Sequence, residues 1–139
     1  MIVFLFSMAV LAAILAAACA IVFPRQCKAL EYHLMSPRPD YREDRPGFLA
    51  WRNRKWAMDK VRTRIGLIGI VCYGVGMGCL IPVQSWVKAA APESLAISPT
   101  AVMVTMGVLS VSLLVVGMRA MIHNHRDTDI SLRREFQDR

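Results

Sequence analysis

The chain has 139 residues, of which 55% are hydrophobic, yet it carries a formal net charge of +7 and has a mean hydropathy of +0.41. A soluble domain this apolar would expose large sticky patches, so the composition argues against a soluble protein. The length allows one structural unit and no separate soluble domain beside a membrane region.

The charged residues are confined to particular parts of the chain. Residues 1–23, 65–87 and 100–118 contain no Asp, Glu, Lys, Arg or His. Each stretch has 19 to 23 residues, and a helix of that length matches the roughly 30 Å hydrocarbon core of a bilayer. The sequence therefore predicts an all-α integral membrane protein with three transmembrane helices. They are joined by a long basic loop (24–64) and a short link (88–99), and a charged tail (119–139) follows.

Orientation follows from the basic residues. Residues 24–64 hold eleven Lys and Arg against five acids, the link holds one of each, and the tail holds five against four. Because Lys and Arg concentrate on the side from which insertion occurs, we expect the loop and tail on the cytoplasmic or matrix side. The N-terminus is then outside and the C-terminus inside, in a bacterial plasma membrane or a mitochondrial inner membrane.

The first apolar segment is predicted to be a retained span. Ala18, Cys19 and Ala20 resemble a cleavage site, but a signal peptide would begin with a basic region, and none precedes the apolar run. Pro24 is expected to end this helix, because proline lacks the backbone N–H donor and disfavours helix before it. A short surface helix can restart over residues 25–35. Two proline-containing turns, at 36–39 and 45–47, then bracket an irregular segment.

A long helix is predicted from about residue 47 to 80, because neither Pro nor Gly interrupts residues 48–65. Its first part would project roughly 25 Å from the membrane. Basic and aromatic side chains surround this extension, and we expect them to contact anionic phospholipid or an acidic protein. Nucleic acid is not expected, because there is no room for a binding fold beyond one helix. The predicted contact residues are Trp51, Arg52, Arg54, Lys55, Trp56, Lys60, Arg62 and Arg64.

Small residues follow the spans at helical spacing. The first span has an alanine stripe of Ala9, Ala13, Ala16 and Ala20. Proline at 82 should kink or end the second helix, and Ser98 followed by Pro99 should start the third. Small residues let helix backbones approach closely in lipid, so we expect the seams of spans two and three to pack together or against other helices. The predicted packing residues are Gly69, Cys72, Gly76, Cys79, Gly74, Gly78, Gly107, Ser110 and Gly117.

No pattern of catalytic, metal-binding or cofactor-binding residues is found. The four cysteines form no C-x-x-C, and Cys72 and Cys79 lie about 10 Å apart on one helix, so we interpret them as packing residues. His33, His123 and His125 are expected at the membrane interface, and no span offers a histidine to a haem. Proton relays and ion-coupled carriers need charged groups at membrane depth, and these spans have none. A hydroxyl such as that of Thr105 is expected to bond a backbone carbonyl.

These observations favour a non-catalytic accessory subunit of a larger hetero-oligomeric membrane complex, for which energy-transducing complexes are the analogy. Its expected partners are other integral membrane subunits and anionic phospholipids, with no small-molecule substrate and no cofactor. The alternative is a membrane-anchored regulator or lipid-binding adaptor that acts through the basic loop. A homo-oligomeric channel or carrier ranks third.

Overall fold

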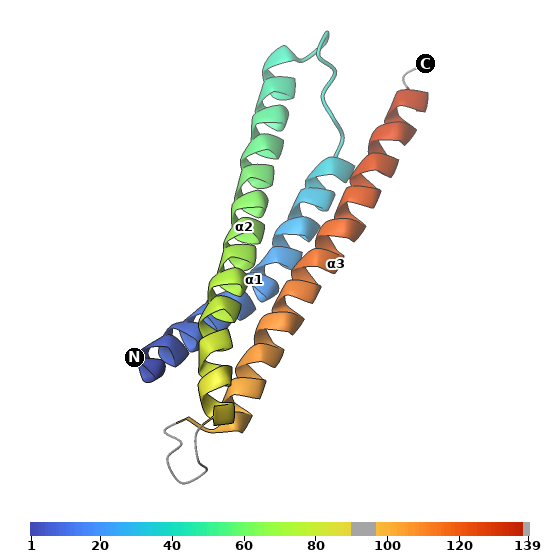
Figure 1. The fold of residues 1–139 in the computed structure, drawn as a ribbon. Coiled ribbons are helices and arrows are strands. Elements are labelled where there is room, and N and C mark those ends of the chain that lie inside the picture. Colours follow the sequence, from blue (N-terminus) through green and yellow to red (C-terminus); the bar gives the residue numbers. More distant parts are fainter. Residues whose placement is uncertain (90–96, 138–139) are drawn as a thin grey trace.

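The computed structural model of the chain describes the backbone of residues 1–89 and 97–137 and the side chains of residues 1–89 and 97–130. Within these residues the fold consists of three α-helices, α1 (Ile2–Met35), α2 (Arg45–Ala89) and α3 (Pro99–Gln137). Each contains a segment long and apolar enough to cross a membrane, which confirms the predicted all-helical chain with three candidate spans. Successive helices run in opposite directions (Figure 1). Most of the predicted link lies outside the described residues.

All three helices extend beyond their charge-free segments. The prediction that Pro24 ends the first helix is wrong, because α1 continues through it to Met35. A proline inside a helix removes one hydrogen bond and crowds the preceding turn, and the chain accommodates this by bending. Figure 1 shows that α1 changes direction part-way along its length. Pro82 likewise lies inside α2, and α3 continues through most of the predicted tail.

The predicted basic loop is therefore mostly helical, and only residues 36–44 connect α1 to α2. Asp44 caps α2, since its Oδ1 accepts a hydrogen bond of 2.9 Å from the backbone N–H of Gly47. Pro46 lies in the first turn, where its missing N–H has no helical partner to lose. The Arg-Pro-Gly sequence at 45–47, which we predicted as a turn, instead begins the helix. The charged parts of the three helices, which are α1 from residue 24 onward, α2 up to residue 64 and α3 from residue 119 onward, lie at the same end of the bundle and are called the charged end.

The first helix holds the bundle together. It contacts α2 most extensively and α3 next, while α2 and α3 contact each other least. Most of its alanine stripe is buried, with Ala9, Ala13 and Ala16 at 0 to 5% exposure and Ala20 half-buried. The facing side of α3 buries residues alternately three and four positions apart, as expected for close helix packing. These residues are Val102, Thr105, Leu109, Ser112 and Val116.

The small residues Gly69, Cys72, Gly76 and Cys79 form one seam of α2, and this seam does not face the small residues of α3. Gly69 and Gly76 are buried, and a Cβ at Gly76 would lie 2.8 Å from Leu109 and 3.3 Å from Ala12. Gly107, Ser110 and Gly117 do not pack against these residues within the bundle, because all three are exposed, and their contact with other helices stays a prediction. The side chain of Leu109 occupies the space that glycine leaves open, and burying a leucine there removes far more apolar surface than a second glycine would.

Candidate functional site

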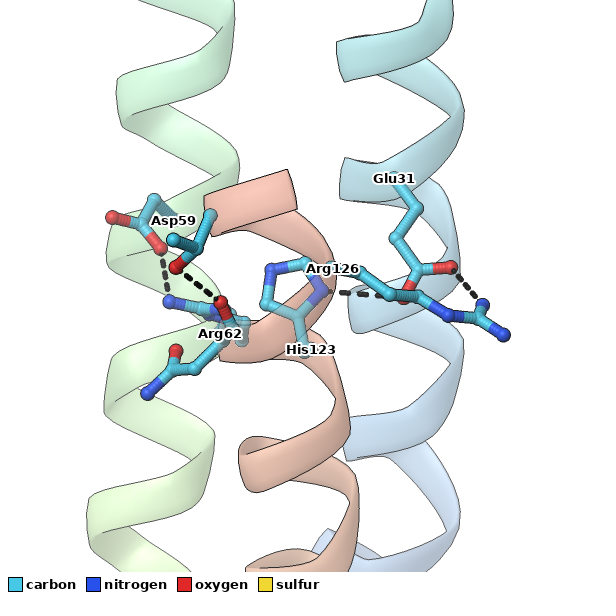
Figure 2. A network of polar contacts seen from close by, with 7 residues as sticks. Glu31, Asp59, Arg62, His123 and Arg126 are labelled. Atoms are coloured by element: carbon cyan, nitrogen blue, oxygen red, sulfur yellow. Dashed lines mark hydrogen bonds and ion pairs between the residues drawn. The ribbon is translucent and has the colours of Figure 1, made fainter. Parts of the chain in front are cut away.

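The charged end contains a polar network between α1 and α3 (Figure 2). Glu31 of α1 accepts a hydrogen bond from His123 Nδ1 at 3.3 Å and another from Arg126 Nη1 at 3.2 Å. His123 and Arg126 share one face of α3 because they are three residues apart. One carboxylate of α1 therefore binds two side chains of α3.

Burial makes His123 the unusual member of this network. Its exposed fraction is 1%, whereas His125, two residues later on the same helix, is exposed. Figure 2 shows the ring between α2 and α1, with Glu31 on the α1 side. Among the described residues, His123 Nε2 is the buried side-chain atom that has no hydrogen-bond partner. Glu31 is thus the polar contact that compensates for burying this ring.

The predicted contact residues of α2 divide into two groups. Trp51 packs within the chain, because its indole stacks on His33 at 5.2 Å and its carbonyl accepts a 3.1 Å hydrogen bond from His33 Nε2. Arg62 pairs with Asp59 at 2.6 Å, and its side chain is only 17% exposed. Trp56 is 76% exposed. The others are outward-facing or half-buried cations: Arg52, Arg54, Lys60 and Arg64 are exposed, and Lys55 is half-buried.

The predicted packing residues also divide. Gly69 and Gly76 lie inside the bundle, with Cys72 and Cys79 half-buried against its core. Gly74 and Gly78 are exposed, and a Cβ on either would meet nothing within 4 Å; the same holds for Gly107 and Gly117. At 100° per residue, Gly74 and Gly78 lie on the opposite face of α2 from Gly69 and Gly76. The structure therefore places four of these nine residues against the core of the bundle, and the other five are exposed.

Polar groups at the depth of the spans are engaged locally. The hydroxyl of Thr105 donates to the carbonyl of Ala101 at 2.8 Å, as expected, and that of Ser112 donates to Val108 at 2.7 Å. The four cysteines are free thiols. Across the described residues, no three His, Cys, Asp or Glu side chains gather as a metal site would require.

No family model, curated protein or solved structure matches the chain. Function is therefore inferred from the geometry.

The pairing of Glu31 with His123 was not predicted from the sequence. A usable signal existed, because His123 continues the spacing of three and four residues that runs from Val102 through Leu109 to Val116. Reading only small residues as packing residues concealed that stripe.

Proposed function

We propose that the chain is a non-catalytic accessory subunit of a larger membrane complex, in which it packs against other membrane subunits. The observation that carries this proposal is the outward position of Gly74 and Gly78. Glycine is about 1 kcal/mol worse than alanine inside a helix, and in contact with lipid alone it has no compensating gain. Against another helix it permits close backbone approach, as in G-x-x-x-G interfaces. The proposed partner at this face is a transmembrane helix of another subunit.

The outward apolar surface supports the same proposal. In the apolar 18-residue segments of α1, α2 and α3, only 22, 17 and 28%, respectively, is buried within the bundle. The remainder must face lipid or other helices, which leaves ample surface for assembly. At the charged end, the exposed Trp56 offers a further contact, since Trp and Arg are enriched where protein interfaces bind most strongly.

We expect Gly74→Leu combined with Gly78→Leu to reduce recovery of partner subunits by about tenfold, because the branched side chains block close helix approach. The measurement is native mass analysis of the complex purified in mild detergent. Gly74→Ala with Gly78→Ala should give a smaller loss, and the isomeric change Ile81→Leu, on the same exposed face, should give none. Wild-type chain that runs as a monomer would contradict the proposal.

A membrane-anchored regulator or adaptor is the second candidate, favoured by the exposure of Trp56 beside Arg52 and Lys60. Such a protein would be monomeric in mild detergent and would bind its partner through the charged end alone. The same native mass measurement therefore decides between the two functions.

The proposed topology has the charged end on the cytoplasmic or matrix side, with loop and tail together, in a bacterial plasma or mitochondrial inner membrane. We expect Tyr41→Cys, in the connection between α1 and α2, to react with an impermeant thiol reagent only after the membrane is opened. Ser98→Cys, at the start of α3, should react in sealed cells or mitoplasts. Labelling of Tyr41→Cys in the sealed preparation would reverse the assignment.

A further inference from the structure

A groove of about 340 Å³ separates α2 from α3 at the level where their charge-free segments end. Figure 1 shows the reason: the two helices approach one another near the short link and diverge toward the charged end. Phe23 of α1 closes the back of the opening. It packs against Gly66, where a Cβ would lie 3.1 Å from its ring, so Gly66 allows the ring to form this floor.

The lining changes character along the groove. Toward the middle of the bundle it is apolar, formed by Leu67, Ile70, Leu113 and Gly117. Leu67 and Ile70 are 60 and 53% exposed, so this part opens sideways toward the surrounding membrane. Toward the charged end it is polar, formed by Arg62, Thr63 and Asn124. The groove is thus amphipathic along its length, in the direction of the membrane normal.

Positive charge is concentrated at the same level. We define the basic collar as the first eight residues beyond each charge-free segment, namely 24–31, 57–64 and 119–126. The collar contains seven Lys and Arg and two acids. Farther from the spans, residues 36–56 contain six basic and three acidic residues, and residues 127–139 contain three and four. The excess charge thus lies where phospholipid headgroups would be.

We propose that this groove binds one anionic phospholipid, with its phosphate beside Arg62 and an acyl chain along Leu67, Ile70 and Gly117. The Nη2 of Arg62 pairs with Asp59, while a guanidinium carries five N–H donors, so others remain to bind a phosphate. A headgroup with net negative charge complements the basic collar, and an acyl chain suits the apolar part. The inference specifies the lipid contact within the proposed function and requires no other subunit.

The test uses a glycine that can be filled without disturbing the fold. Nothing lies within 4 Å of a Cβ at Gly117 or at Gly107. Gly117→Leu places a side chain in the groove, whereas Gly107→Leu adds the same side chain to α3 nearly three turns away and outside the groove lining. Arg62→Gln removes the cation from the polar end. Matching thermal unfolding curves for the two leucine variants would show that the fold is kept.

Native mass spectrometry of the full chain in mild detergent, titrated with phosphatidylglycerol or with phosphatidylcholine of the same acyl chains, measures the binding. We expect preference for phosphatidylglycerol, a loss of roughly tenfold or more in Gly117→Leu, and no change in Gly107→Leu. Arg62→Gln should weaken binding about fivefold, the ratio equivalent to ~1 kcal/mol for a cation at an anionic surface.

Three results would overturn the inference: equal affinity for both lipids, unchanged binding in Gly117→Leu, or displacement of the lipid by millimolar inorganic phosphate. Partner recovery from the same preparations separates this inference from the proposed function. Selective lipid binding by a chain that recovers no partners would support the lipid site and refute the subunit role. Recovery of partners by a chain that binds no lipid selectively would refute the lipid site and support the subunit role.

Discussion

Gly76→Leu should destabilise the three-helix bundle by at least about 2–3 kcal/mol in the free energy of unfolding. At this position all three helices meet, and a Cβ alone would lie 2.8 Å from Leu109 of α3 and 3.3 Å from Ala12 of α1. Leu109 is completely buried, so it has little freedom to move aside, and the Cβ of Ala12 can move only with its backbone. The added side chain must separate α1 from α2. Reversible unfolding in mixed detergent micelles, followed by circular dichroism, measures the loss.

Three variants isolate the cause of this loss. Gly74→Leu adds the same side chain to the opposite face of α2, where nothing lies within 4 Å, and should leave stability of the isolated chain unchanged. Gly69→Ala should be tolerated, because its Cβ would lie at an ordinary 3.4 Å from Cys19. Leu109→Ala should partly restore Gly76→Leu by opening space. Equal stability of Gly76→Leu and Gly74→Leu would show that the three helices do not meet at Gly76.

The spans were predictable because their signal is local. An apolar segment that must exclude charge over about 30 Å is defined by its own residues, whatever its neighbours are. The start of α3 at Pro99 was predictable for the same reason, since proline favours the first turn of a helix. The helical part of α2 before its charge-free segment was predictable from the long stretch without Pro or Gly before Gly66.

The helix partners could not be predicted in the same way. Gly69 and Gly107 both qualify as small residues at helical spacing, yet one is buried and the other faces outward. The difference depends on where α1 lies, which no local pattern of α2 or α3 contains. The prediction that α1 ends at Pro24 was wrong for a related reason. Beyond the proline, Cys27 and Leu30 are buried against the other helices, and this burial stabilises the continued helix.

At the charged end, too, some features were visible in the local sequence and others depend on how the helices are arranged. The basic residues of the collar were visible in the sequence, but the groove between α2 and α3 depends on their divergence. Glu31 and His123 are 92 positions apart, and only the three-helix arrangement brings them together. Because α2 and α3 contact one another least, α1 must be fixed to both. Gly76 and its neighbours fix it within the spans, and Glu31 fixes it to α3 at the charged end.

Glu31→Ala should therefore lower the free energy of unfolding by about 1–3 kcal/mol, the cost of leaving a buried polar group without a partner. The variant removes the acceptor of His123 Nδ1, in a ring that is 1% exposed and whose Nε2 already has no partner. Loss of the Arg126 contact should contribute little, because that side chain is 58% exposed. Glu31→Gln, which retains an acceptor oxygen, should lose less. The measurement is the same micelle unfolding equilibrium.

A double variant distinguishes an unpaired histidine from a simple loss of packing. His123→Leu combined with Glu31→Ala removes both polar partners, so it should be more stable than Glu31→Ala alone. His125→Leu is the matched control, because that histidine is exposed two residues away on the same helix and should tolerate the change. If the double variant were less stable than Glu31→Ala, the histidine would stabilise the bundle through its packing rather than through the carboxylate. If Glu31→Ala were as stable as His125→Leu, the contact would not hold α1 to α3, and the charged ends of these helices would be fixed by apolar contacts alone.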